Sequence, residues 1–454
     1  MNMNIKTNSK KVNEGDTFVA IKGNVYDGHD FIEEAIKRGA SNIICEYGEY
    51  SVPYITVPST KEYLNNYLHD TYYKEIKDIT LIGVTGTNGK TTSCYLLYEL
   101  LKLLNVKCAY IGTIGFYMKD KVRDLDNTTP ELLELYEIFL ECKRSNTEVI
   151  VMEVSSHALE LDRVYGLKYD YVVFTNLTED HLSFHNTMEE YLEAKMKLFA
   201  RLKDNGISIS NKDDSYSKYF IDKNTITYGM RNSDYKIIDY KLNIDKTLYE
   251  IEVNKKKYKV RINMPGRYNI YNSIISLIVL NDMGYNINIV IALLNKVTLP
   301  KGRMEIVKHN KSVIIIDYAH TPDAIKNALT NGNEFKKSKL YTIVGCGGNR
   351  DKGKRKEMGL IATNLSDYVI FTNDNPRDED EAEIVNDIIS GLRFNNYEII
   401  LNRKDAIRKG IDLLKGKDIL FILGKGHEDY QVIKGVKNHF SDKEEVIKYL
   451  NERN

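Results

Sequence analysis

The sequence lacks a net charge, because its 64 lysines and arginines balance its 64 aspartates and glutamates. Without an overall electrostatic field, composition favours neither nucleic acid nor a membrane surface as a partner. One short basic run, KKKYK at 255–259, lies in a segment with the alternation of a β-strand, and we interpret it as part of a solvated hairpin. We therefore expect no nucleic-acid partner and no membrane partner.

Cysteines are also few and scattered, at positions 45, 94, 108, 142 and 346. Their number is odd and no two form a C-x-x-C pair, which argues against a disulfide framework and against a zinc site. No stretch of about 18 apolar residues occurs, and the first residues, MNMNIKTNSKK, lack the apolar segment of a signal peptide. These absences predict a soluble, cytoplasmic chain whose thiols lie buried in its cores.

A chain of 454 residues is too long for one ordinary core, so we expect several domains. Residues 1–78 alternate short strands with two helical segments, which predicts a small α/β unit. Residues 79–304 begin with a glycine-rich turn, and residues 305–454 alternate apolar strands with helical periodicity. Such alternation is typical of a doubly wound parallel sheet. The KGR sequence at 301–303 is the expected hinge.

The stretch GVTGTNGKTT, residues 83–92, has the composition of a phosphate-binding loop. An apolar run precedes it and leucines at helical spacing follow it, so the glycines occupy a turn between a buried strand and a helix. Backbone N–H groups and the positive end of a helix dipole bind anions at such a turn. Lys90 would reach the β- and γ-phosphates and the Thr91 hydroxyl would face Mg²⁺. The loop is a variant, because Val84 stands where the usual pattern has its first glycine.

Polar side chains follow two further apolar strands of the second block. EVSSH places Glu153 at the end of one strand, and TNLTEDHLSFH places Asp180 and His181 after the next. The helical segment EEYLEAKMKLF then carries Lys195 between apolar positions. A carboxylate and an imidazole beside a triphosphate are candidate Mg²⁺ ligands, although Mg²⁺ prefers oxygen. From spacing alone, a capping or structural hydrogen bond explains these histidines equally well.

The third block carries polar groups at four strand ends, in DYAHTPD, GCGGNRDKGKR, TNDNPR and GKGHEDYQ. Ligands of doubly wound sheets bind beyond the carboxyl ends of the strands. A structural sheet has no need of so many charged groups along one edge. We therefore expect a second binding site at this edge.

These motifs together resemble one family. TGTNGKTT, EVSSHALELDRV, NLTEDHLSFH, EEYLEAKMKLF, PGRYNIYN, KGRMEIV, DYAHTPD, GCGGNRDKGKR, TNDNPR and GKGHEDYQ resemble the Mur ligases in order and spacing, in particular their MurE type. The resemblance covers nearly the whole chain. It implies an α/β fold of three domains: a domain at 1–78 that binds the UDP-sugar, a central P-loop ATPase domain with a parallel sheet at 79–304, and a Rossmann-like domain at 305–454 that binds an amino acid.

The resemblance also implies an activity. In this family the γ-phosphoryl group of ATP activates a carboxylate as an acyl phosphate, an amine attacks it, and phosphate leaves. The receiving carboxylate would be the D-glutamate of UDP-N-acetylmuramoyl-L-alanyl-D-glutamate, and the amine would come from meso-diaminopimelate, in peptidoglycan precursor synthesis. Phosphoryl transfer of this kind depends mainly on positioning and charge neutralisation. ATP would be a substrate, Mg²⁺ the cofactor, and the enzyme a monomer.

Matching positions imply the roles of individual residues. The catalytic group would be Lys90, Glu153, His181 and Lys195. The metal ligands would be Thr91, Glu153, His181 and Lys195, the last as a carbamate. ATP would contact Gly86, Thr87, Asn88, Gly89, Lys90, Thr91, Thr92, Asn269, Arg303 and Asp317. The muramoyl dipeptide would contact Ser9, Asn127, Thr128, Thr129, Ser155 and Arg163. The amino acid would contact Arg350, Asp374, Asn375, Pro376, Arg377, Gly424 and Glu428.

Arg377 decides between two amino acids. Meso-diaminopimelate ends in a carboxylate and an ammonium, whereas lysine ends in an ammonium only. A guanidinium presents a planar fork that matches a carboxylate, and Glu428 would take the ammonium. Lysine would leave Arg377 without a partner, and unpaired buried polar groups discriminate strongly between substrates. We therefore expect diaminopimelate.

Four alternatives stay open. The same ligase adding L-lysine is opposed by Arg377, and a folylpolyglutamate-type ligase by residues 1–78 and by the DNPR and GKGHEDYQ motifs. A nucleotide-binding regulatory module would leave Glu153 and Lys195 unexplained. The first block departs from the family pattern, with Asn8 and Lys10 where aspartate and arginine are usual, so a paralogue with another muramoyl or glutamyl acceptor is a further reading.

Overall fold

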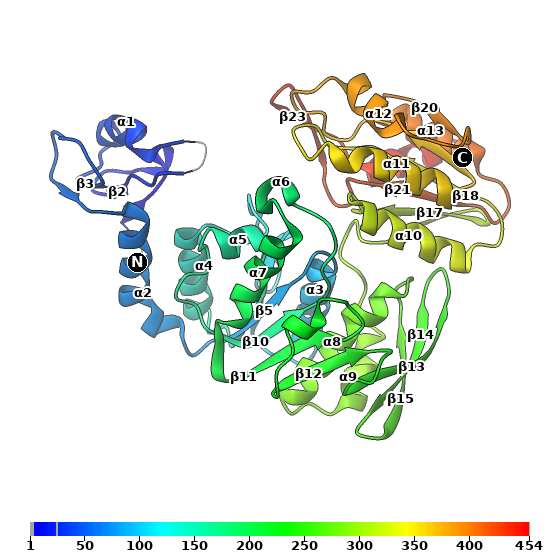
Figure 1. The fold of residues 1–454 in the computed structure, drawn as a ribbon, viewed down its shortest axis with the longest axis horizontal. Coiled ribbons are helices and arrows are strands. Elements are labelled where there is room, and N and C mark those ends of the chain that lie inside the picture. The colour runs from blue at the N-terminus through cyan, green and yellow to red at the C-terminus, as the bar shows by residue number, and fades with distance from the viewer. Residues whose placement is uncertain (1–3, 24–25, 454) are drawn as a thin grey trace.

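The computed structural model describes residues 4–23 and 26–453 and arranges them as three α/β units, each built on its own sheet (Figure 1). In Figure 1 the first unit lies at the upper left, the second below it in the centre, and the third at the upper right. The expected α/β class with three domains is therefore confirmed. The boundaries after 78 and 304 stay predictions.

The first unit has a parallel sheet of order β1-β2-β3-β4. Its elements are β1 (Ile5–Lys6), β2 (Thr17–Val19), α1 (Ile32–Lys37), β3 (Asn42–Cys45), β4 (Tyr54–Thr56) and α2 (Thr60–Ile76). Helix α2 leaves this unit and packs against α4 of the second (Figure 1). Because Leu64 and Leu68 of α2 are buried in the same cluster as α4, this helix joins the two units.

The second unit has an eleven-stranded sheet of order β15-β14-β13-β12-β11-β10-β5-β9-β6-β7-β8. The strands from β13 to β6 are parallel, and antiparallel strands extend both ends. The strands are β5 (Thr80–Thr85), β6 (Cys108–Gly112), β7 (Gly115–Tyr117), β8 (Lys121–Arg123), β9 (Val149–Glu153), β10 (Tyr169–Phe174), β11 (Leu202–Asn211), β12 (Thr225–Gly229), β13 (Tyr235–Leu242), β14 (Thr247–Val253) and β15 (Lys256–Ile262). The helices are α3 (Lys90–Leu103), α4 (Leu132–Arg144), α5 (Ser156–Glu160), α6 (Leu182–His185), α7 (Met188–Phe199), α8 (Tyr268–Asp282) and α9 (Ile287–Leu294).

Both faces of this sheet are buried, as its apolar strands require. Side chains alternate between faces along a strand, and parallel sheets carry helices on both faces. On β9, Val149 and Val151 pack into the core that includes α3 and α8, whereas Ile150 and Met152 pack into the core that includes α4. The phosphate loop thus starts from a rigid, doubly covered strand.

The third unit has a six-stranded sheet of order β16-β17-β21-β18-β19-β20, parallel except for β16. Its strands are β16 (Glu305–His309), β17 (Ser312–Asp317), β18 (Leu340–Val344), β19 (Tyr368–Phe371), β20 (Tyr397–Ile399) and β21 (Ile419–Leu423), with a separate hairpin of β22 (Tyr430–Ile433) and β23 (Val436–His439). Its helices are α10 (Pro322–Phe335), α11 (Gly353–Leu365), α12 (Glu381–Ile389), α13 (Arg403–Leu413) and α14 (Asp442–Glu452).

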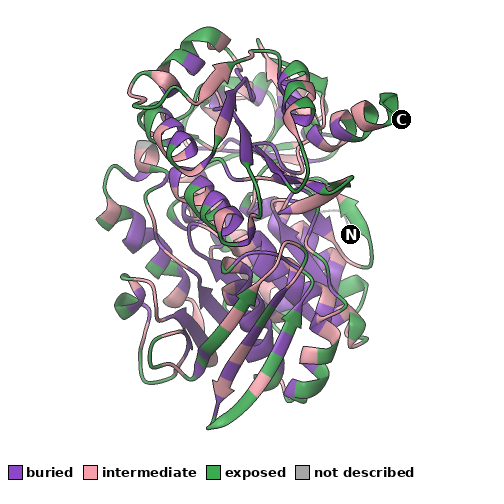
Figure 2. Cartoon of the chain, turned by 90° about the vertical axis from the view of Figure 1, so that its right-hand side faces the viewer, coloured by how far each residue is buried: buried purple, intermediate pink, exposed green. Residues whose placement is uncertain are grey.

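Several expectations from composition are confirmed. All five cysteines are buried free thiols. The basic run at 255–259 lies in the hairpin of β14 and β15, whose outer residues are exposed (Figure 2). Within the described ranges, no helix is both long and apolar enough to cross a membrane. The sequence analysis did not identify β6 or α4. The apolar run of β6 is only five residues long.

Gly302, in the expected hinge, offers a test of how the second and third units meet. Its φ of +69° lies in the left-handed region, and a Cβ there would overlap the backbone of Gly426 and His427. Gly284 has a φ of +91° but open space around it. We expect Gly284→Ala to cost about 1–2 kcal/mol of strain, and Gly302→Ala to cost about 1–3 kcal/mol more because the backbones must separate.

Thermal unfolding and small-angle X-ray scattering would measure both variants. Only Gly302→Ala should raise the radius of gyration. Equal melting temperatures and equal radii for the two variants would contradict the close contact between this linker and the loop after β21.

Candidate active site

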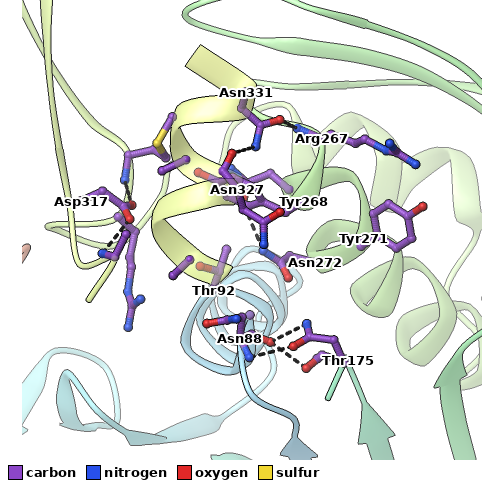
Figure 3. A pocket seen from close by; sticks show the side chains of 18 of the residues that line it. Asn88, Thr92, Thr175, Arg267, Tyr268, Tyr271, Asn272, Asp317, Asn327 and Asn331 are labelled. Atoms are coloured by element: carbon purple, nitrogen blue, oxygen red, sulfur yellow. Dashed lines mark hydrogen bonds between the residues drawn. The ribbon is translucent and has the colours of Figure 1, made fainter. Parts of the chain in front are cut away.

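The phosphate loop lies between β5 and α3, as the sequence predicts. Gly86 has a φ of +145° and Gly89 a φ of +89°, conformations that favour glycine. A Cβ on Gly86 would overlap the Thr175 hydroxyl. The tip of β10 holds the loop from the side: Thr175 Oγ1 donates to the Asn88 carbonyl at 2.7 Å, and Asn88 N–H donates to Asn176 Oδ1 at 2.9 Å (Figure 3).

Lys90 is the cation of this loop. Its Nζ donates to the carbonyls of Gly86 at 2.8 Å and Thr87 at 2.9 Å, so the ammonium folds back over the loop. Burial lowers the pKa of Lys90, with Glu153 and Asp180 acting in the opposite direction. An ammonium held on carbonyls at the start of a helix is placed to meet a phosphate.

Glu153, at the end of β9, is fully buried and densely hydrogen-bonded. Its Oε2 accepts from Thr91 Oγ1 at 2.9 Å, and its Oε1 accepts from the Tyr110 hydroxyl at 2.5 Å and from Thr113 N–H at 2.9 Å. Arg303 Nη2 donates to the same Thr91 oxygen at 3.1 Å. The structure therefore brings together three of the residues assigned from sequence, Thr91, Glu153 and Arg303.

Part of the set expected to contact the muramoyl dipeptide surrounds Glu153. Thr129 Oγ1 donates to the Glu153 carbonyl at 2.9 Å and accepts from Ser155 N–H at 3.0 Å. Arg163 pairs with Glu131 at 2.7 Å and donates to the Thr129 carbonyl at 3.3 Å. The Thr128 hydroxyl lies 3.1 Å from that of Thr113. Thr128, Thr129, Ser155 and Arg163 thus form one group.

Ser9 and Asn127 are not part of that group. Ser9 lies in the first unit and donates to Glu34 at 2.8 Å. Asn127 is exposed. Their assignment to the muramoyl dipeptide stays a prediction.

Lys195, on α7, is 1 % exposed and lies with Nζ 4.2 Å from the centre of the Tyr191 ring. Among the described residues, none forms a hydrogen bond or ion pair with its amine. Burial lowers the pKa of Lys195 far below its ordinary value, and nearby Lys90 lowers it further, with Asp180 acting in the opposite direction. Burial without a hydrogen-bonding partner therefore disfavours the charged form of this amine.

His181 precedes α6 in a left-handed conformation, with a φ of 58°, and its Nε2 lies 3.3 Å from Asp180 Oδ2. Desolvation lowers the pKa of His181, with Asp180 acting in the opposite direction and His157 and Lys90 lowering it further. The ring of His157 lies 4.7 Å from it, centre to centre. His181 contacts Asp180, and its assignment with Glu153 as a metal ligand stays a prediction.

A cavity of about 380 Å³ opens beside the phosphate loop (Figure 3). Its walls come from the loop, from α8 of the second unit, and from β17 and α10 of the third. The expected ATP contacts that line it are Asn88, Gly89, Thr92, Asn269, Arg303 and Asp317. Its size suits a nucleoside.

The side chains of Asp317 and Asn269 form hydrogen bonds with backbone groups in the wall of this cavity. Asp317 accepts from Met304 N–H at 2.7 Å and Ala319 N–H at 2.9 Å, which ties the linker to the end of β17, and burial raises its pKa. Asn269 donates to the Pro265 carbonyl at 2.6 Å.

Sequence reasoning missed further residues of the cavity: Arg267, Tyr268, Tyr271, Asn272, Asn327 and Asn331. Most lie on two helices whose polar positions look like ordinary solvated faces. The PGRYNIYN motif contained the first four and was the available signal.

The expected amino-acid residues gather at the carboxyl edge of the third sheet. Asn375 Nδ2 donates to Glu428 Oε2 at 2.8 Å, and Arg377 Nη1 donates to the Gly348 carbonyl at 2.8 Å. A Cβ on Gly424 would overlap the carboxylate of Asp374, so these two loops touch. Pro376 is buried between Asn375 and Arg377.

Charges of both signs meet there. Burial lowers the pKa of Arg377, with Arg350 nearby, whereas burial beside Asp374 raises the pKa of Glu428. Lys425, fully buried, lies 3.3 Å from Glu428 Oε2. Arg350 is exposed at the rim.

Two contacts carry residues of the third unit to the phosphate loop. Asn88 Nδ2 donates to Asp323 Oδ2 at 2.8 Å, and Lys354 Nζ lies 4.0 Å from Asp180 Oδ1. The start of α11, which carries Lys354, thus faces the segment after β10 that carries Asp180.

Fold and site together define a class of proteins that bind a nucleoside triphosphate at a phosphate loop and cover it with a further α/β domain. Similarity makes the class specific. The sequence matches the Mur ligase middle domain at residues 84–280, the glutamate ligase domain of Mur ligases at 302–426, and the Mur ligase family catalytic domain at 3–80. The chain belongs to the Mur ligase family, which are ATP-dependent ligases that form amide bonds.

Individual relatives match this chain over nearly their whole length. The chain is 41% identical to "UDP-N-acetylmuramoyl-L-alanyl-D-glutamate--2,6-diaminopimelate ligase 1" of Clostridium acetobutylicum, over 99% of this chain and 95% of that protein. It is 40% identical to the 2,6-diaminopimelate ligase of Aquifex aeolicus, over 98% and 93%.

Solved structures share the fold. A UDP-N-acetylmuramoyl-L-alanyl-D-glutamate--2,6-diaminopimelate ligase superposes with a TM-score of 0.69 at 30% identity, covering 99% of this chain and 94% of that one. The MurF ligase of Thermotoga maritima in complex with ADP superposes with a TM-score of 0.68 at 23% identity, covering both chains fully.

Filling the cavity should block nucleotide binding. Ala324, half-buried on α10, lines the cavity. We expect Ala324→Phe to weaken ADP binding at least about tenfold, because the phenyl ring would occupy part of the space that the nucleotide needs. Isothermal titration calorimetry with ADP would measure this. Ala382→Phe, at an exposed position on α12, is the matched control and should bind ADP normally. Unchanged ADP affinity in Ala324→Phe would place the nucleotide elsewhere.

Proposed function

We propose that this chain uses ATP to join meso-diaminopimelate to the D-glutamate carboxylate of UDP-N-acetylmuramoyl-L-alanyl-D-glutamate, a step of peptidoglycan precursor synthesis. The observation that carries the choice of amino acid is the edge of the third sheet, where Arg377 and Arg350 lie near the carboxylates of Asp374 and Glu428. Relatives that bear this activity in their names match the chain over nearly its whole length. The two supports are independent, since one is local geometry and the other overall similarity.

The reaction balances in two steps. A carboxylate oxygen of the dipeptide bonds to the γ-phosphorus of ATP as the bond to ADP breaks, giving an acyl phosphate. The amine of the incoming amino acid then attacks the acyl carbon, a tetrahedral intermediate forms, and phosphate leaves as the amine loses a proton.

The chain's own groups supply positioning and positive charge for these steps. Lys90 lies on the phosphate loop, ready to exchange its two loop carbonyls for phosphate oxygens. Arg303 reaches the same point through Thr91. The substrate carboxylate and the triphosphate are both anions and repel each other. Cations at this point offset that repulsion, so the two groups can be positioned for phosphoryl transfer.

The donor set around Thr91 and Glu153 fits Mg²⁺ in part. Mg²⁺ takes oxygen ligands and is often held by one or two carboxylates together with substrate phosphates. The Thr91 hydroxyl and the Glu153 carboxylate lie 2.9 Å apart beside the loop. In the described ranges, no three His, Cys, Asp or Glu side chains converge on one point, so these two would act with phosphate oxygens. Bound there, the ion would neutralise charge on the transferring phosphoryl group.

Lys195 is proposed to carry a carbamate. An uncharged amine can react with CO₂, whereas a permanently charged arginine cannot. The amine of Lys195 is buried and lies near Lys90 and Asp180, and its burial lowers its pKa. The carbamate would add an oxygen anion near the cationic side chain of Lys90.

L-lysine in place of diaminopimelate is the second candidate. It leaves the guanidinium of the half-buried Arg377 without a substrate partner, which costs a charge-assisted hydrogen bond. A cytoplasmic location and a monomeric state complete the proposal. The five buried free thiols support a reducing compartment.

Arg377→Ala tests the amino-acid assignment. We expect kcat/KM for meso-diaminopimelate to fall at least about tenfold, since a charge-assisted hydrogen bond contributes about 1.5–3 kcal/mol. Affinity for ADP should change less than about twofold. Arg377→Lys keeps the charge and loses the planar fork, so it should rescue only part of the activity. Equal losses for the amino acid and for ADP would show that the loop at 374–377 serves another role.

Lys195→Ala tests the carbamate. Turnover should fall by about 10²-fold or more, as expected when a positioned charge near the phosphoryl group is lost, and a small added carboxylate should restore part of it. Lys197→Ala is the matched control on the same helix, because Lys197 is exposed and pairs with Glu160. Full turnover in Lys195→Ala would remove Lys195 from the mechanism.

Phosphate release tests the whole proposal. The assay contains ATP, Mg²⁺ and UDP-N-acetylmuramoyl-L-alanyl-D-glutamate, with meso-diaminopimelate or L-lysine. Release with diaminopimelate alone is expected. Release with lysine alone would keep the ligase and refute the choice of amino acid, and no release with either would point to another acceptor.

A further inference from the structure

A buried ion pair lies directly beneath the proposed amino-acid pocket. Arg403 Nε donates to Asp442 Oδ1 at 2.7 Å, and Arg403 Nη2 donates to Asp442 Oδ2 at 2.8 Å. Both side chains are completely buried. The two residues are 39 positions apart and are the first residues of α13 and α14. None of the steps derived above uses them.

The guanidinium also binds the backbone of both pocket loops. Arg403 Nη1 donates to the Asn373 carbonyl at 3.2 Å, and Arg403 Nη2 donates to the Leu423 carbonyl at 3.0 Å. Asn373 directly precedes Asp374, and Leu423 directly precedes Gly424. The loops follow β19 and β21, which are separated in the sheet by β18. One side chain therefore bridges two strand ends that do not pair with each other.

The spacing of those loops matters for the pocket. The Asp374 carboxylate already fills the space in which Gly424 would carry a side chain. Gln431 fixes the same segment from the other side, donating to Asn373 Oδ1 at 2.7 Å and to the Asp374 carbonyl at 2.8 Å. A small shift of either strand end would change the distance between Asp374 and the loop that carries Glu428.

Helix stability does not explain the arginine. A cation at the first position of a helix opposes the helix dipole, and α13 already has Asn402 as its cap. A fully buried ion pair is also weak support for stability, because desolvation offsets the attraction between the charges. A residue that opposes the stability of its own helix and gains nothing locally is often found at a functional site.

We infer that Arg403 and Asp442 are positioning residues that set the geometry of the amino-acid pocket by holding the ends of β19 and β21 in register. This inference rests on the proposed function, since it assigns the pocket to the incoming amino acid. The charge of Arg403 is felt in the pocket as well: Asp442, Asp374 and Glu428 together outweigh burial and raise the pKa of Arg403. The pair thus sets the spacing, and its guanidinium is the member that interacts electrostatically with the two pocket carboxylates.

The test replaces both members of the pair with apolar residues of similar size, Arg403→Met with Asp442→Leu. Removing only one would leave an uncompensated buried charge, whereas exchanging both often preserves folding. The control is Arg408→Met with Glu452→Leu, because that pair joins the same two helices at 3.0 Å on the surface, away from the pocket. Both double variants are assayed for phosphate release, for ADP binding and for thermal unfolding.

We expect the buried double variant to fold and to bind ADP within about twofold of the wild type. Its KM for meso-diaminopimelate should rise at least about tenfold, since small misplacements of binding groups cost up to about 10²-fold. The control variant should keep the wild-type KM. Equal KM values in the two double variants would overturn the inference and leave the pair a structural element.

A conservative variant covers the case in which the double variant does not fold. Arg403→Lys keeps the charge but cannot bridge Asp442 and two carbonyls in the same plane. A raised KM for the amino acid with normal ADP binding supports the inference, and an unchanged KM overturns it.

Failure of the proposed function is read separately, from the wild type. Absence of phosphate release by the wild type with any amino acid refutes that function. Hydrogen exchange of the backbone at 373–378 and 424–428 then tests, in the absence of substrate, whether Arg403 and Asp442 position these loops. Faster exchange there in Arg403→Lys, with control helices unchanged, supports positioning, and equal exchange overturns it.

Discussion

The buried carboxylate of Glu153 is the constraint on which the site depends. A charge without access to water must be paired or hydrogen-bonded, and Glu153 meets this need with Thr91, Tyr110 and Thr113. Those three partners come from the phosphate loop, from β6 and from the turn that follows β6. Satisfying one carboxylate therefore fixes the loop that would hold the triphosphate and the strand beside it. Through Thr91, it also fixes the linker residue Arg303.

The third unit contacts the second through polar side chains near the phosphate loop. The contacts that reach the phosphate loop from the third unit are single polar interactions, such as Asn88 with Asp323 and Lys354 with Asp180. Polar contacts of this kind exchange readily with water, in contrast to the apolar packing of α2 on α4. The division suits a ligase that has to admit a nucleotide and an amino acid from one side while the muramoyl substrate is held on the other.

Sequence reading found the parts of the site that are contiguous in the chain and missed those that only folding assembles. The phosphate loop was predictable because Gly86, Gly89 and Lys90 stand together and their chemistry follows from spacing. Tyr110 and Thr113 were not, because a hydroxyl after a five-residue strand has no signature of its own. The same holds for Arg403 and Asp442, whose pairing depends on the crossing of two helices. The contact of His181 with the neighbouring Asp180 lies within one motif, TNLTEDHLSFH.

Two buried lysines of the chain differ in the partners that surround their amines. Lys425 is fully buried beside Glu428 and Asn375, so its ammonium has acceptors and balances a carboxylate of the pocket. Lys195 is almost as buried but lies on a tyrosine ring, and in the described part of the chain no acceptor pairs with it. Because desolvation is uncompensated at Lys195, burial lowers the pKa of that amine far below its ordinary value. The two lysines thus differ in their hydrogen-bonding partners rather than in their burial: Lys425 has acceptors, whereas the amine of Lys195 has none among the described residues.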